Sequence, residues 1–121
     1  MAWEQFKSKG GKFTPQITLN KSGGFGMTSG AHHRHELDKY NGVILYYDKE
    51  ANKVGVRLVV ELEPGMFRLK KRPEQKGAYF SARSFLEAYN IDPKQQAGRY
   101  DFEEVSDQQN GNMFVIQLKS N

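Results

Sequence analysis

Three histidines lie within a span of four residues. His32, His33 and His35 are all the histidines of this 121-residue chain, and Glu36 and Asp38 follow them. On a helix, His32 lies one turn from His35 and Glu36, so three side chains able to bind Zn²⁺ would share a face. No fourth ligand is identifiable, because the chain has no cysteine and no other histidine, and the His-Glu-x-x-His spacing of zinc proteases is absent. We therefore expect neither a metal nor any other cofactor.

Two clusters of positive charge are the other candidates for a functional site, in a chain whose net charge is +4. The first lies near the N-terminus, where only Glu4 opposes Lys7, Lys9, Lys12 and Lys21. The second lies in "FRLKKRPEQKG", where only Glu74 opposes Arg68, Lys70, Lys71, Arg72 and Lys76. Cations gathered on one face of a protein bind polyanions, whereas scattered cations are ordinary solvated surface. The sequence alone leaves both readings open.

Patterns of enzymatic chemistry are missing. The glycines of "SGGFGMTSG" match neither the phosphate-binding P-loop nor G-x-G-x-x-G, and the nucleophile elbow G-x-S-x-G does not occur. Glu103 and Glu104 are adjacent on a predicted strand and would point to opposite faces of its sheet, which disfavours an acid–base pair. We expect no enzymatic activity. Trp3, Phe6 and Phe13 in the basic N-terminal segment suit either stacking on bases or attachment of this segment to the domain.

Length and composition predict one soluble domain. A chain of 121 residues suits a single core, and the lack of cysteine excludes disulfides and fits a reducing compartment. The N-terminus has no apolar region of signal-peptide type, and the longest apolar run, residues 43–47, is far too short to span a membrane. We expect a cytoplasmic protein with no membrane partner.

Strand patterns dominate the chain. Alternating or β-branched apolar residues predict strands over 16–20, 42–48, 53–62, 65–71, 98–105 and 112–119. A polar turn at 48–52 joins the second and third strands, and Asn110-Gly111 predicts a tight turn before the last.

Two helices are expected. The clearer covers 81–90, with Ser81 as its N-cap, Asn90 as its left-handed end, and Phe85, Ala88 and Tyr89 on its inward face. The other contains the histidines and begins at Thr28 or Ser29.

The order of predicted elements occurs twice. Residues 16–62 and 66–119 each read as strand, glycine-containing loop, short helix, strand, turn, strand, with offsets that grow from 50 at Ile17 to 53 at Gly24 and 58 at Val54. Each unit has an apolar face that it cannot bury alone, so two units in one chain would cover each other. We expect a mainly β (α+β) domain over 16–121, a small barrel or sandwich of about six strands with two short helices, preceded by a basic arm over 1–15.

The strand–helix–hairpin order resembles the swapped-hairpin barrel of the AbrB-like and addiction-antitoxin family of bacterial DNA-binding regulators. The resemblance lies in "ITLNKSGGFGMTSGA" and "VILYYDKEANKVGVRL", and in "FRLKKRPEQKGAYFSARSFLEAYNI" followed by "GRYDFEEV" and "NMFVIQL". It implies DNA contact through the first strand of each unit and the loop that follows. In this chain those residues are Lys21 in the first unit and Arg68, Lys70, Lys71 and Arg72 in the second.

The duplication also changes the interpretation of the histidines. At an offset of 53, His32 and His35 correspond to Phe85 and Ala88, which are predicted to face inward. We therefore interpret these histidines as half-buried structural residues and place the functional site at Arg68 to Lys76. The sequence thus predicts a non-enzymatic DNA-binding protein whose partner is double-stranded DNA, with a homo-oligomer allowed but not required. The alternative is a protein-interaction or structural module that does not bind nucleic acid.

Overall fold

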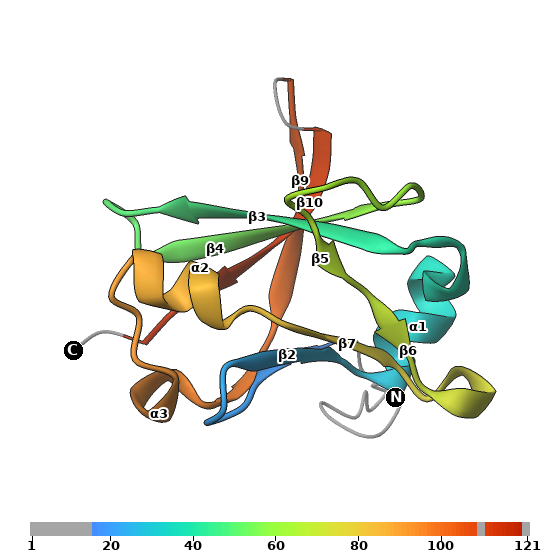
Figure 1. Cartoon of the computed structure of the whole chain (residues 1–121), viewed down its shortest axis with the longest axis horizontal. Coiled ribbons are helices and arrows are strands. Elements are labelled where there is room, and N and C mark those ends of the chain that lie inside the picture. Colours follow the sequence, from blue (N-terminus) through green and yellow to red (C-terminus); the bar gives the residue numbers. More distant parts are fainter. Residues whose placement is uncertain (1–15, 109–110, 120–121) are drawn as a thin grey trace, which may run out of the picture.

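A computed structural model describes residues 16–108 and 111–119, apart from the side chains of residues 32–34, 75 and 107 (Figure 1). The predicted arm over 1–15, with Lys7, Lys9 and Lys12, lies outside the described residues, as does Asn110 of the predicted tight turn. The first half of the chain forms β1 (Ile17–Leu19), β2 (Gly24–Met27), α1 (Ser29–His35), the 3-10 helix η1 (Leu37–Lys39), β3 (Gly42–Asp48) and β4 (Lys53–Val59). The second half forms β5 (Phe67–Arg68), β6 (Lys70–Lys71), the 3-10 helix η2 (Pro73–Gln75), β7 (Ala78–Ser81), α2 (Arg83–Ala88), α3 (Pro93–Gln96), β8 (Gly98–Tyr100), β9 (Phe102–Asp107) and β10 (Gly111–Gln117).

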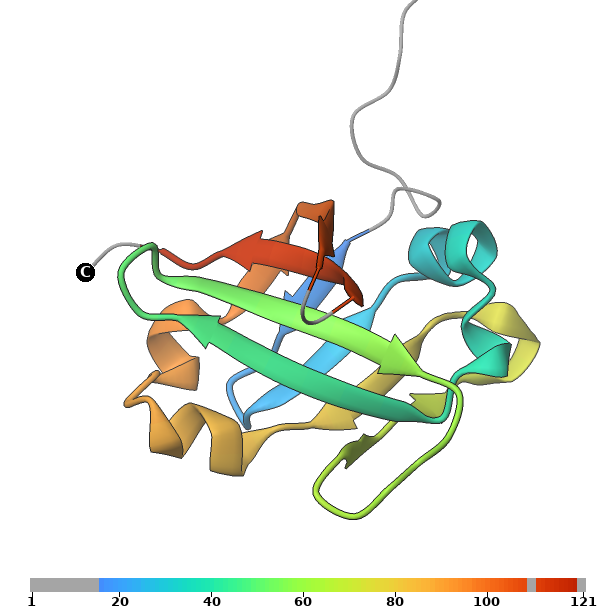
Figure 2. The same cartoon turned by 90° about the horizontal axis from the view of Figure 1, so that it is seen from above.

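The ten strands form two five-stranded antiparallel sheets, which confirms the mainly β class. Sheet A has the order β6-β7-β2-β1-β8, and sheet B has the order β5-β3-β4-β10-β9. The sheets lie one above the other, with the short helices at the two ends (Figures 1 and 2). Their inner faces bury an apolar core whose largest fully buried side chains include Phe25, Phe80, Ile17, Leu19 and Ile116.

Two long strands pass from one sheet to the other, and both are interrupted at the crossing. Leu69 separates β5 in sheet B from β6 in sheet A, and Asp101 separates β8 in sheet A from β9 in sheet B. The backbone N–H of Leu69 donates to the carbonyl of Asn41 and not to sheet A. The sheets therefore meet at two corners without closing into a barrel, so the sandwich is the one of the two expected forms that is observed.

The glycine-containing segments are strands and not the loops that the sequence suggested. β2 and β7 pair at the centre of sheet A, where Phe25 lies opposite Phe80 and Gly26 lies opposite Tyr79. Glycine weakens a strand on its own, but here the apolar residues between the glycines face the core, and the Phe25 and Phe80 rings stack with centroids 5.3 Å apart. This pairing, together with the strand breaks, accounts for ten strands in place of about six.

The helices differ in detail from the prediction. Ser81 ends β7, and α2 begins after Ala82, with no side-chain cap. Leu86 is buried beside Phe85, whereas Ala88 is exposed and Tyr89 is 48% exposed, so the predicted inward face was wrong for those two positions. Asn90 does adopt a left-handed conformation. A third helix, α3, begins at Pro93, because proline suits the first helical position and Asp92 accepts a hydrogen bond from the N–H of Lys94.

The same order of elements occurs in both halves of the structure, strand, strand, helix, strand, strand, with extra breaks in the second half. The duplication remains a prediction, and the observed registers are compatible with it: Gly26 lies opposite Tyr79, an offset of 53, and Val56 lies opposite Phe114, an offset of 58. Among the described helices, none has the length and apolar character needed to cross a membrane.

Candidate nucleic-acid interface

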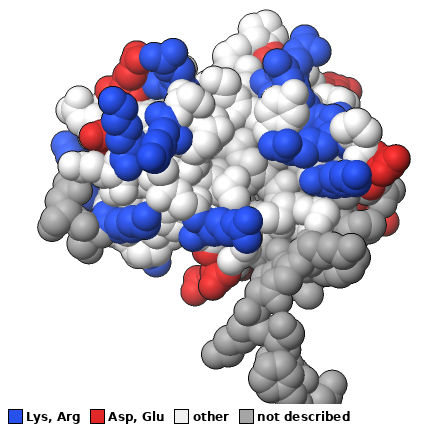
Figure 3. Space-filling view, turned by 90° about the horizontal axis from the view of Figure 1, so that it is seen from below, with Lys and Arg blue, Asp and Glu red and all other residues white. Residues whose placement is uncertain are grey.

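Part of the second basic cluster lies at the outer face of sheet A. Side chains alternate between the two faces of a strand, so the burial of Ala78 and Phe80 leaves Tyr79 on the outer face. The same alternation along β2 turns Gly24 and Gly26 outward. Seen from this side, Lys and Arg side chains gather around an uncharged hollow, and the acidic side chains lie toward the rim (Figure 3).

The hollow is a shallow groove of about 370 Å³. Its floor includes the backbone of Gly24 and Gly26 on β2, beside the side chains of Asn20 and Thr18. One wall consists of Arg68, Lys70 and Arg72, and the other of Thr18, Asn20 and Ser22. Among the described residues, none that lines the groove is acidic. The groove is therefore basic along one side and neutral, with hydrogen-bonding groups, along the other.

Tyr79 is the exposed aromatic residue of this groove, with 40% of its surface accessible. The guanidinium carbon of Arg72 lies 5.0 Å from the centre of its ring, and Nζ of Lys70 lies 5.9 Å from it. Both are cation–π distances. Among the described residues, neither these two cations nor Arg68 forms an ion pair with a carboxylate. Their charges are available to an anionic ligand.

The neutral wall is fixed by the turn between β1 and β2. Oδ1 of Asn20 accepts hydrogen bonds from the N–H of Ser22 at 3.1 Å, from its hydroxyl at 2.6 Å, and from the N–H of Gly24 at 2.9 Å. The hydroxyl of Thr18 donates to the carbonyl of Gly26 at 3.4 Å. These bonds hold the wall in place, so a ligand would meet a surface that is already ordered.

The structure brings together only part of the predicted set of cations. Arg68, Lys70 and Arg72 line the groove, and Lys76 lies beside Arg72 in an adjoining hollow, where it pairs with Glu74 at 3.3 Å. Lys71 does not line the groove, because it alternates with Lys70 along β6, and its Nζ donates to Oδ1 of Asn41 at 2.8 Å.

Lys21 lies at the far end of the groove. It lines another hollow with Arg83 and Lys94, and this hollow also contains Glu87 and Asp92 and shares Ser22 with the groove. The adjoining hollow at the other end shares Thr18, Gly26 and Arg72 with the groove. The groove and this adjoining hollow form one track along sheet A, whereas the hollow at Lys21 lies against α2 and α3.

Sequence reasoning missed Tyr79 and the glycine floor. The pattern that could have revealed Tyr79 is the alternation in "AYFS", because the side chain of Tyr79 points to the face of the strand opposite to that of Ala78 and Phe80. The same rule separates Lys71 from its neighbours Lys70 and Arg72. The glycine floor of the groove could not be predicted without the pairing of β2 with β7, and no local sequence pattern reveals that pairing.

Comparisons of this chain with protein-family models, with curated proteins and with solved structures found no match.

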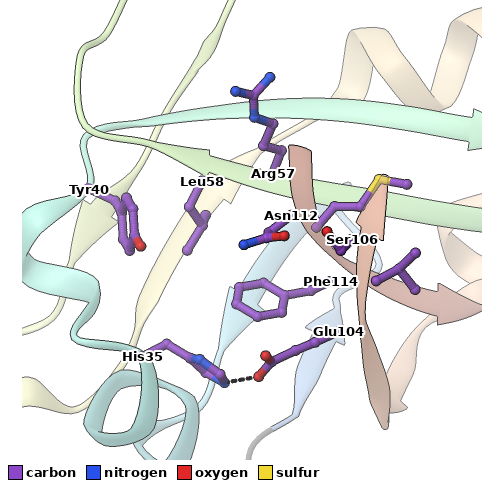
Figure 4. Close-up of a pocket in the computed structure, with 10 residues that line it drawn as sticks. His35, Tyr40, Arg57, Leu58, Glu104, Ser106, Asn112 and Phe114 are labelled. Atoms are coloured by element: carbon purple, nitrogen blue, oxygen red, sulfur yellow. Dashed lines mark ion pairs between the residues drawn. The ribbon is translucent and has the colours of Figure 1, made fainter. Parts of the chain in front are cut away.

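A separate hollow, of about 470 Å³, lies outside this surface, where α1 approaches β9 and β10 (Figure 4). Nε2 of His35 lies 3.1 Å from Oε1 of Glu104, and the imidazole packs against Phe114 and Phe102 with ring centroids 4.7 and 5.9 Å apart. The His35 side chain is 14% exposed, as expected for a half-buried structural residue. The side chains of His32 and His33 lie outside the described part of the structure.

This hollow is lined by three acidic or basic residues, His35, Arg57 and Glu104. Among the described residues, no three histidine or acidic side chains are placed to hold a metal ion. The Arg57 side chain extends away from His35 and Glu104 (Figure 4). The contact between His35 and Glu104 joins α1 to the β9–β10 hairpin.

Proposed function

We propose that this protein is a non-enzymatic nucleic-acid-binding protein that binds the phosphate backbone through the outer face of sheet A. The observation that supports this most directly is the convergence of Arg68, Lys70 and Arg72 on one wall of a groove that is lined by no acidic residue of the described part of the chain. Three cations held together without carboxylate partners repel one another, and phosphates of a ligand would relieve that repulsion.

Two further features favour nucleic acid over other polyanions. Tyr79 offers an aromatic face beside the cations, and base–aromatic stacking is a common part of nucleic-acid binding. The hydroxyl and amide groups of the opposite wall can hydrogen-bond to sugars and base edges. The resemblance to AbrB-like regulators, which places DNA contacts at the same basic strand, agrees with this proposal.

The proposal is tested by fluorescence anisotropy with labelled DNA, single-stranded and duplex, at about 50 mM salt, where phosphate contacts are strong. We expect binding by the native protein and a large loss in the variant Arg68→Ala/Lys70→Ala/Arg72→Ala.

The matched control is Lys39→Ala/Lys49→Ala/Lys53→Ala, which removes the same charge at positions that do not line the groove. It should bind nearly as well as the native protein. Absence of binding to both kinds of DNA, or equal losses in the two triple variants, would refute the proposal.

A further inference from the structure

We infer that the groove on sheet A takes single-stranded nucleic acid in preference to duplex. This inference rests on the proposed function and specifies the class of ligand. The ligand would lie along β2, with its phosphates toward Arg68, Lys70 and Arg72 and its bases toward Tyr79 and the neutral wall.

The asymmetry of the two walls is the first argument. A single strand carries phosphates along one edge and bases along the other, whereas a duplex presents phosphates along both edges of each groove. The groove has cations on one wall and only Thr18, Asn20 and Ser22 on the other. Its charge distribution therefore matches a single strand.

The shape of the surface is the second argument. Proteins that read the major groove of duplex DNA insert a protruding helix or β-ribbon into it. Sheet A instead presents a hollow at its centre, where Gly24 and Gly26 carry no side chains of their own and only the neighbouring Asn20 and Thr18 side chains lie close to them. The bases of a duplex are stacked on each other, so their faces could not reach the ring of Tyr79, whereas an unstacked base could.

The length of the surface is the third argument. From Ser22 to Thr28 the track follows seven residues, four of which form β2, so at ~3.3 Å per residue it is at most about 20 Å long. This length suits a short single-stranded site, at the lower end of the range of about 4–16 nucleotides known for single β-domains.

Arg99 is the residue whose substitution distinguishes duplex binding from single-strand binding. It is exposed on β8 opposite Thr18, beyond the neutral wall, and it does not line the groove. Four strand spacings, about 19 Å, separate β8 from β6, which carries Lys70. A duplex lying across the sheet would use both edges and need Arg99, whereas a single strand in the groove would not.

The experiment measures the affinities of oligothymidylate and oligouridylate of about 12 nucleotides, and of a mixed-sequence duplex of equal length, at about 50 mM salt. We expect both single strands to bind at least about 10-fold more tightly than the duplex, and their ratio to show whether DNA or RNA is preferred. Tyr79→Leu should weaken single-strand binding by roughly 5- to 150-fold, the range for loss of one stacked base. Tyr79→Phe keeps the ring and should bind as the native protein does, and Arg99→Ala should change single-strand binding less than about 2-fold.

A second variant blocks the groove without changing charge. A Cβ on Gly26 would lie 2.7 Å from Oγ1 of Thr18, so Thr18→Ala/Gly26→Val places a side chain on the floor while removing that contact. It should abolish single-strand binding, whereas Thr18→Ala alone should not. Circular dichroism and thermal melting establish that each variant is folded.

The outcomes separate the inference from the proposed function. Duplex binding as tight as single-strand binding, or native affinity in Tyr79→Leu, or equal losses in Arg99→Ala and Arg68→Ala, would overturn the inference and leave nucleic-acid binding intact. Failure of the native protein to bind any of the three ligands would overturn the proposed function, and the inference with it.

Discussion

The salt dependence of binding is the quantity that the groove determines most directly. Arg68, Lys70 and Arg72 line one wall and form no ion pairs within the described residues, so each is available to neutralise one phosphate. Each neutralised phosphate of a single strand contributes about −0.7 to the slope of log K against log salt concentration, so the three together contribute about −2. Between about 50 and 200 mM salt, this contribution alone weakens binding by about 20-fold.

The assay is fluorescence anisotropy of a labelled oligothymidylate over that salt range. The variant Arg68→Ala/Lys70→Ala/Arg72→Ala should show a slope shallower by about 2 than that of the native protein, and the control Lys39→Ala/Lys49→Ala/Lys53→Ala should show an almost unchanged slope. Lys76→Ala should change the slope less than Arg72→Ala does, because Glu74 already neutralises Lys76 at 3.3 Å. Parallel salt slopes in the native protein and the groove variant would refute the assignment of phosphate contacts to this wall.

Three further predictions concern the scaffold that holds the groove. Phe80 is 1% exposed, and Phe80→Ala should lower the free energy of unfolding by about 3–5 kcal/mol in urea titrations. Gly77→Ala should lower the melting temperature far more than Gly65→Ala does. Both glycines have positive φ, but a Cβ on Gly77 would lie 2.1 Å from a carbonyl oxygen of β2, whereas a Cβ on Gly65 would have nothing within 4 Å. Burial raises the pKa of Tyr100, so the unfolded state ionises first and native stability should fall as pH rises above about 10. Tyr100→Phe loses the hydrogen bonds to Gln96, which should lower the free energy of unfolding by about 1–2 kcal/mol at pH 7. Because only the native protein has a tyrosine to ionise at this position, urea unfolding at pH 10.5 should show a smaller difference between the two proteins. A constant or larger difference would contradict the prediction.

The sequence predicts the strands best in the hairpin that begins at Gly42. β3 over Gly42–Asp48 and the start of β4 at Lys53 match the prediction, because β-branched and aromatic residues between polar turns specify a strand locally. β2 and β7 depend on each other across the centre of sheet A, so their local glycine content misled the prediction. The break at Leu69 depends on a hydrogen bond to Asn41 from another part of the chain, which no local pattern contains.

The candidate site also depends partly on local sequence patterns and partly on long-range contacts. Alternation along "FRLKKR" is sufficient to put Arg68, Lys70 and Arg72 on one face and Lys71 on the other, so three of the predicted contacts could be sharpened from sequence. That the opposite wall is neutral could not be known before β1 and β6 were placed on either side of the β2–β7 pair. Clustering of charge is a property of sheet order, and sheet order is a long-range outcome of folding.

The duplication hypothesis gives the asymmetry of the groove a physical reason. At the predicted offset of 50, the neutral wall residues Thr18, Asn20 and Ser22 correspond to the basic wall residues Arg68, Lys70 and Arg72. In the first unit, the four residues between β1 and β2 form a tight turn that needs the amide oxygen of Asn20 for three hydrogen bonds. In the second unit, η2 widens the connection, and a backbone hydrogen bond of 2.8 Å from Arg72 to Gly77 closes it. The side chain at position 70 is therefore not needed to form the connection, and a lysine can occupy it. The short turn of the first unit requires a neutral amide at Asn20, whereas the longer connection of the second unit allows a cation at Lys70.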